Sequence, residues 1–240
     1  MKKRIVGLVC LALIGAGTLL FIEDVPGEGL AEPSMEKMAK NSDPASKTTT
    51  SSLDIKQLQA TATNLMSDIV RKFKLDKVKV VREKCDEDNA FYDPETKSIT
   101  ICLEMVDSVW AYAQEQDTDP KIQKDIATNS LMFFFLHELG HAYIDVMQFP
   151  VTGREEDVAD QIASYFILEL EKDNSFDWIA DGAFTFYQYS EENPEIDEEA
   201  LADVHSLDKQ RFYNIACWLY GATADESIVT DRGLPEERAQ

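Results

Sequence analysis

Basic residues are scarce in this chain of 240 residues. Its 23 lysines and arginines stand against 45 aspartates and glutamates, which gives a formal net charge of -22 at pH 7. A chain with this charge is repelled by nucleic-acid phosphates and by anionic lipid headgroups, and no basic patch along the sequence offsets the repulsion. We therefore expect no nucleic-acid partner, and we interpret the acidic residues as a solvated surface.

Cysteine is rare as well, with four residues, and the chain has no internal repeats. Cys10 lies in an apolar run near the N-terminus, and Cys85, Cys102 and Cys217 lack the spacing of a metal-binding cysteine pair. Cys85 and Cys102 flank a hairpin whose turn is expected at 93–96. We predict a disulfide between them, with two buried free thiols as the alternative. Cys217 lies in an apolar stretch and is expected in the core.

The N-terminal region has the pattern of a targeting segment. Lys2–Arg4 is followed by an uncharged apolar run, Ile5–Ile22, which is typical of a secretory signal peptide or an uncleaved membrane anchor. We assign residues 1–31 to this leader and residues 32–52, which are polar and aperiodic, to a disordered linker. The protein is therefore expected outside the cytoplasm, periplasmic or secreted, or held at the membrane by its leader. An oxidising compartment also suits the predicted disulfide.

Apolar periodicity predicts an α+β fold with more helix than strand. Residues 53–222 would form one domain, followed by a polar, frayed tail at 223–240. The alternation in Lys77–Arg82 predicts a strand, and a hairpin has its arms at Phe91–Tyr92 and Ile99–Leu103. Helical spacing predicts helices at Leu53–Phe73, Leu103–Glu115, Ile122–Met147, Arg154–Lys172, Trp178–Tyr189 and Ser206–Gly221.

His137-Glu138-Leu139-Gly140-His141 is the most informative segment of the chain. A helix repeats every 3.6 residues, so histidines four apart share one face and can bind one metal ion, with Glu138 beside it. The apolar run Leu131–Leu136 leads into this motif and predicts a buried helix. The alternative is a pair of partly buried histidines hydrogen-bonded to neighbours. Burying two histidines and a glutamate is costly without a strong partner, which favours a metal.

The following helix offers a third metal ligand. Thr152 and Glu155 have the spacing of a capping box, in which Glu155 would bond to the backbone N–H of Thr152. Glu156 and Asp160 are four residues apart and share a helix face. We therefore expect Glu156 to bind the metal and Asp160 to accept a hydrogen bond from a ligand histidine. A solvated, acidic first turn is the alternative, and it explains Asp160 poorly.

These motifs resemble those of the gluzincin metallopeptidases, including the thermolysin-like and minigluzincin groups, and most closely a bacterial metallopeptidase family of unknown function. The resemblance covers roughly residues 53–222. It implies a small zincin-like metalloprotease domain, mostly helical, with a small sheet or hairpin beside the motif helix. It also implies Zn2+ held by His137, His141 and Glu156, with Glu138 as general base and Asp160 in support. The segments that carry it are Asn89–Pro94, Ile99–Cys102, His137–Asp145, Gly153–Gln161 and His205–Gly221.

Other metal sites fit less well. A metzincin needs a glycine and a third histidine three and six residues after His141, where this chain has Ile144 and Met147. Asp145 lies roughly 12 Å from His137 at a helix rise of about 1.5 Å per residue, which is too far to share the ion. Two imidazoles and a carboxylate, with a glutamate alongside, suit zinc hydrolysis better than iron or manganese.

Two functions are consistent with these residues. The first is an exported zinc metallopeptidase acting on a peptide or protein substrate, in which Glu138 takes a proton from water and returns it to the leaving amine. The second is a catalytically silent, zinc-stabilised binding protein on the same fold. The presence of Glu138 favours the enzyme, because a binding protein does not need a base there.

Two further expectations concern the substrate. His205 is the candidate donor to the oxyanion, with a locally hydrogen-bonded histidine as the alternative and with Arg211 and Tyr213 as further candidates. The resemblance to zincin-like folds also implies that an extended peptide pairs with an edge strand beside the site, for which Ile99–Cys102 is the candidate.

Overall fold

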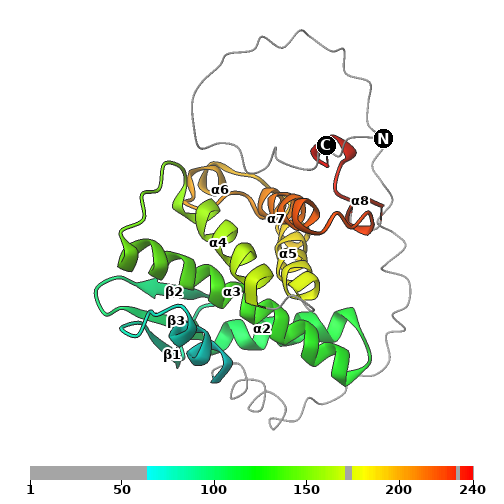
Figure 1. Ribbon diagram of the computed structural model, residues 1–240. Helices are drawn as coiled ribbons and strands as arrows, with labels where there is room; N and C mark the ends of the chain where they lie inside the picture. The colour runs from blue at the N-terminus through cyan, green and yellow to red at the C-terminus, as the bar shows by residue number, and fades with distance from the viewer. Residues whose placement is uncertain (1–63, 171–174, 231–232, 240) are drawn as a thin grey trace, which may run out of the picture. The chain divides into compact units, whose positions relative to one another are not determined.

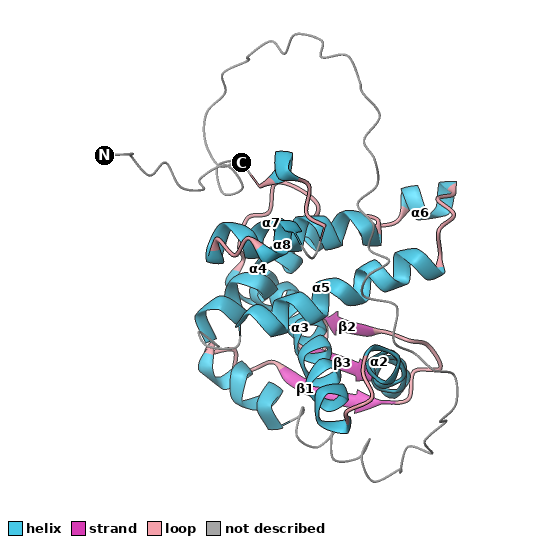
Figure 2. Ribbon diagram, turned by 90° about the vertical axis from the view of Figure 1, so that its right-hand side faces the viewer, coloured by secondary structure: helices cyan, strands magenta, loops and turns pink. Residues whose placement is uncertain are grey.

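The computed structural model describes residues 64–170, 175–230 and 233–239. These residues form an α+β protein that is mostly helical, with one small sheet (Figures 1 and 2). The described residues up to 219 belong to one compact unit and the described residues from 220 on to another. The predicted leader, linker and first part of the Leu53–Phe73 helix lie outside the described residues. Within them, no helix has the length and apolarity needed to cross a membrane.

The sheet has three strands in the order β1-β3-β2: β1 (Lys79–Glu83), β2 (Ala90–Asp93) and β3 (Ser98–Cys102). β1 pairs with β3 in parallel, and β2 pairs with β3 antiparallel as the predicted hairpin. Asp93 holds the turn, because its carboxylate accepts hydrogen bonds from the backbone of Glu95 and the hydroxyl of Thr96.

β3 is the central strand, so the prediction that Ile99–Cys102 forms an edge is wrong. β1 pairs with the side of β3 opposite to β2, so β1 and β2 are the edge strands of this sheet. Four of the five residues of β3 are buried in succession, a pattern typical of a strand covered on both faces.

A disulfide joins Cys85 to Cys102, as their positions around the hairpin predicted. Cys85 follows β1, and Cys102 ends β3 opposite Glu83. The carboxylate of Glu104 accepts hydrogen bonds from the backbone N–H groups of Cys85 and Asp86 at 3.1 and 3.0 Å. The loop that leads into β2 is therefore fixed at both the sheet and the adjoining helix.

Within the described residues, the helices agree with the predicted segments to within a few residues, and three short ones, α6, α8 and η2, are additional. Helix α6 was not predicted, because it is short and has no buried residue to give it apolar periodicity. The tail expected to be frayed contains α8 and a 3-10 helix, η2, and its Ile228 and Leu234 are buried. The bounds are α2 (Leu103–Gln116), α3 (Pro120–Met147), α4 (Glu155–Leu170), α5 (Ser175–Glu192), α6 (Glu198–Ala202), α7 (Asp208–Thr223), α8 (Ser227–Thr230) and η2 (Glu236–Arg238).

Helix α3 is the central element, and it contacts α2, α4, α5 and the sheet. It begins after Asp119, whose side chain accepts a hydrogen bond from the backbone of Lys121. The apolar run before the motif is buried, as predicted. Gly140 lets α4 approach closely, because a Cβ atom there would lie only 3.1 Å from the Cα atom of Ala159. The close approach brings the acidic start of α4 to the two histidines of α3.

Candidate metal centre

His137 and His141 face the start of α4 from one side of α3. Their Nε2 atoms lie 3.3 Å apart, and each faces the Oε2 atom of Glu156, at 3.1 and 3.2 Å. Three tetrahedral ligands at the usual zinc distances of about 2.0–2.1 Å would themselves be separated by roughly 3.3 Å. The spacing of these three atoms therefore fits a metal ion without rearrangement of the helices.

The charges of this cluster also suit a cation. Burial alone would raise the pKa of Glu156, but hydrogen bonds from His137, His141 and His205 lower it far below its usual range. Burial lowers the pKa of His141, but hydrogen bonds to Glu156 and Glu155 and the charge of Glu138 outweigh burial and raise this pKa to about 9. The carboxylates thus favour positive charge on the imidazoles, and a metal ion could take the place of those protons.

Asp160 lies behind His137, as predicted. Its Oδ1 atom lies 2.7 Å from Nδ1 of His137. Although burial raises the pKa of Asp160, hydrogen bonds and charge from Arg211 and His137 lower it to about 2. An ionised carboxylate can only accept, so Nδ1 of His137 carries the proton and Nε2 is left to face Glu156 and His141.

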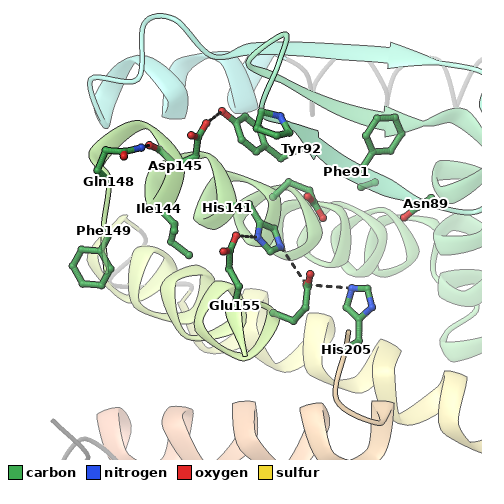
Figure 3. A pocket seen from close by; sticks show the side chains of 14 residues that line it. Asn89, Phe91, Tyr92, His141, Ile144, Asp145, Gln148, Phe149, Glu155 and His205 are labelled. Atoms are coloured by element: carbon green, nitrogen blue, oxygen red, sulfur yellow. Dashed lines mark hydrogen bonds and ion pairs between the residues drawn. The ribbon is translucent and has the colours of Figure 1, made fainter. Parts of the chain in front are cut away.

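Glu155 contacts His141 in place of the predicted capping box. Helix α4 begins at Glu155, so this residue is at the first helical position and not at the third. Its Oε1 atom lies 2.9 Å from Nδ1 of His141, a contact that Figure 3 shows. The capping assignment was wrong because it considered only the local helix. The second nitrogen of His141 also needs an acceptor, and two adjacent carboxylates can serve two histidines.

Glu138 lies beside the cluster. Its Oε1 atom is 4.0 Å from Nε2 of His137, and the residue is 8% exposed. Burial raises the pKa of Glu138, against the smaller lowering effects of the charges of His137 and His141 and of a hydrogen bond from the backbone of Tyr92. A carboxylate with a raised pKa can both accept and return a proton near neutral pH.

His205 reaches the cluster from the loop before α7. Its Nε2 atom lies 3.2 Å from Oε2 of Glu156 (Figure 3). Its Nδ1 atom lies 2.8 Å from Oδ1 of Asp203. Hydrogen bonds to Glu156 and Asp203 raise the pKa of His205 against the effect of burial. The guanidinium of Arg154 donates to the His205 carbonyl at 2.9 Å and helps hold the loop.

Two overlapping sets of ligand atoms can be drawn within the described residues. The atoms of His137, Glu156 and His205 all lie within 4.8 Å of one another. Those of His137, His141 and Glu156 lie within 3.3 Å of one another, which is closer to the spacing around one ion. We therefore prefer the set that contains His141 and place His205 next to it.

The other candidates for the oxyanion donor do not line the cleft. Arg211 is 7% exposed and its guanidinium binds Asp160 through two hydrogen bonds. Tyr213 packs against Phe212. His205 is the candidate that reaches the cleft wall.

The cluster opens into a cleft of about 690 Å³, with β2 along one side and His205 on the other (Figure 3). Glu156 also lines this cleft. The hydroxyl of Tyr92 donates to Asp145 at 2.6 Å, and Nζ of Lys97 donates to the same carboxylate at 2.5 Å. These bonds hold the hairpin against the C-terminal part of α3. Asp145 therefore has a structural role in joining the hairpin to α3.

Alternate residues of β2 direct their backbone groups away from β3. The backbone N–H of Cys102 donates to the Asn89 carbonyl at 3.1 Å, which makes these residues a hydrogen-bonded pair. Such pairs alternate along an antiparallel ladder, so the backbone groups of Ala90 and Tyr92 point away from β3. Both residues line the cleft.

A largely helical α+β domain with a histidine and carboxylate cluster in an open cleft has the features of a metal-dependent hydrolase. The chain belongs to a metallopeptidase family: the model of the family DUF4344, described as "Putative metallopeptidase", matches residues 40–240. No curated protein and no solved structure matched the chain. Membership of this family implies a peptidase and a metal ion, and the cluster is where such an ion fits.

Proposed function

We propose that this protein is a zinc-dependent metallopeptidase that works outside the cytoplasm. The observation that carries the proposal is the close grouping of His137, His141 and Glu156 with buried Glu138 beside them, at a cleft that His141, Glu156 and Glu138 line. The first three residues would hold the zinc, because two imidazoles and one carboxylate are ligands typical of a catalytic zinc site.

The residues around the site have complementary roles in this proposal. When bound, zinc would lower the pKa of a water molecule and polarise the scissile carbonyl. Glu138 takes a proton from the attacking water and passes it to the leaving amine, which its raised pKa favours. His205, held by Asp203, donates Nε2–H to the carbonyl oxygen as negative charge develops there.

The substrate would be an extended peptide paired with β2. The outward backbone groups of Ala90 and the carbonyl of Tyr92 are available to form a short ladder with it, in place of the strand Ile99–Cys102 that the sequence suggested. The backbone N–H of Tyr92 bonds to Glu138 instead. Two observations test the activity directly: the zinc content of the purified chain, and cleavage of a peptide library. A chain that binds zinc and cleaves peptides at a defined position would support the proposal.

Replacement of His205 separates its two possible contacts with the site. His205→Ala should keep zinc at wild-type stoichiometry and lower kcat by roughly 10²–10³-fold, the usual cost of removing a donor to an oxyanion. The measurement is zinc content together with kcat and KM. Loss of the metal from this variant would instead place His205 among the ligands, in the set with His137 and Glu156.

The proposed compartment gives a second test. Protein isolated from its native host without reductant should come from outside the cytoplasm and carry the Cys85–Cys102 disulfide, since oxidising compartments preserve such bonds. Peptide mapping by mass spectrometry with cell fractionation would measure both. Cytosolic protein in which both thiols react with an alkylating reagent would contradict this part of the proposal.

A further inference from the structure

Arg211 is a buried arginine that reaches the metal centre through Asp160. We propose that Arg211 is a positioning residue: it fixes the carboxylate of Asp160, which in turn fixes the His137 ring for metal binding. This inference rests on the metal site of the proposed function, and its test does not need peptidase activity.

The contacts form a continuous chain through the core. The Nε and Nη2 atoms of Arg211 donate to Oδ2 and Oδ1 of Asp160 at 2.9 and 2.8 Å. The same Oδ1 atom accepts from Nδ1 of His137 at 2.7 Å. A bidentate hydrogen bond of this kind fixes the plane of the carboxylate as well as its position. The orientation of Asp160, and with it that of the His137 ring, therefore depends on Arg211.

Three helices meet in this network. Arg211 comes from α7, Asp160 from α4 and His137 from α3, and the three residues are 7%, 2% and 4% exposed. The guanidinium of Arg211 also lies over the ring of Phe186, 3.9 Å from its centroid. Packing therefore limits where the guanidinium can lie, and solvent is largely excluded from the bonds it makes.

A charged carboxylate at this depth needs more than one donor. His137 supplies one hydrogen bond to Asp160, and Arg211 supplies two more with a full positive charge. Removing one member of a buried ion pair leaves the other with an uncompensated cost of desolvation. Asp160 would then rotate or take up a proton, and His137 would lose the acceptor that orients it.

Zinc affinity tests the proposal. In the full chain, Arg211→Met should weaken zinc binding by about 10–100-fold, the range seen when a group that supports a ligand is lost. Arg211→Lys should also weaken zinc binding measurably, because an ammonium keeps the charge but cannot form both hydrogen bonds to the Asp160 carboxylate in one plane. Lys209→Met is the matched control: it removes a cation from the same helix, but Lys209 pairs with Glu191 at the surface, and zinc affinity should stay within about twofold.

A double variant shows whether Arg211 acts through Asp160. Asp160→Asn should itself weaken zinc binding, and adding Arg211→Met should then change the affinity by less than about threefold, since the partner of the arginine is already altered. Competition with a chelator gives the dissociation constants. Unchanged affinity in Arg211→Met, or independent effects that multiply in the double variant, would overturn the proposal.

Stability is measured separately, because Arg211 also supports the core. Melting of the metal-free variants reports a general loss of packing, whereas the visible spectrum of Co²⁺-loaded protein reports the geometry of the ligands. A lower melting temperature with an unaltered Co²⁺ spectrum and affinity would assign Arg211 a structural role only and reject the inference. If Arg211→Met does not fold, Arg211→Lys carries the same test. Failure of the unaltered chain to bind zinc would overturn the proposed function itself.

Discussion

Glu138→Gln should leave the fold and the bound zinc intact while removing most of the peptidase turnover. The amide nearly matches the carboxylate in shape, and Oε1 of Glu138 is 4.0 Å from Nε2 of His137, beside the three proposed ligand atoms. An amide cannot take a proton from water, however. We expect kcat to fall by about 10²–10⁴-fold, the usual contribution of a general base, with little change in zinc content.

His137→Ala is the control that separates binding from chemistry. It removes a proposed ligand, so zinc and activity should be lost together, whereas Glu138→Gln should lose activity alone. Zinc analysis and peptide-library cleavage of both variants are the measurements. If the wild-type chain holds zinc but cleaves nothing, and Glu138→Gln behaves identically in every assay, a zinc-stabilised binding protein becomes the better explanation.

The parts of the site that depend on helical spacing could be predicted from the sequence. His137 and His141 are four residues apart on α3, as Glu156 and Asp160 are on α4, so each pair shares a face wherever the helix is placed. The buried character of α3 was also readable, because its apolar residues extend around the whole helix before the motif. Both inferences concern one helix at a time.

The features that were missed depend on contacts between elements. The partner of Glu155 is His141, fourteen positions away, and a local capping pattern pointed elsewhere. The order of the strands follows from the pairing of β1 with the side of β3 opposite to β2, which no alternation within a strand reveals. Arg211 was considered as a donor in the cleft, but packing of α7 against Asp160 directs it inward.

The two adjacent glutamates at the start of α4 should differ sharply in their effect on zinc. Oε2 of Glu156 lies 3.1 and 3.2 Å from the Nε2 atoms of His137 and His141. Glu155 instead contacts Nδ1 of His141, and its side chain is half exposed. Glu156→Ala removes a proposed ligand and should weaken zinc binding by well over the roughly 10–100-fold typical of supporting residues. Glu155→Ala should weaken it by about tenfold, toward the lower end of that range.

Each change is a matched control for the other. Both remove one carboxylate from the first turn of the same helix, where a negative charge contributes about 0.3–1 kcal/mol through the helix dipole. This dipole contribution is lost in both variants, but Glu156→Ala also loses hydrogen bonds from three histidines and should lower the metal-free melting temperature more. The melting temperature of each metal-free variant is therefore measured beside its zinc affinity. Chelator competition on the two variants measures the difference in zinc affinity. Equal losses of zinc affinity would refute the assignment of Glu156 as the ligand, and a larger loss in Glu155→Ala would transfer that role to Glu155.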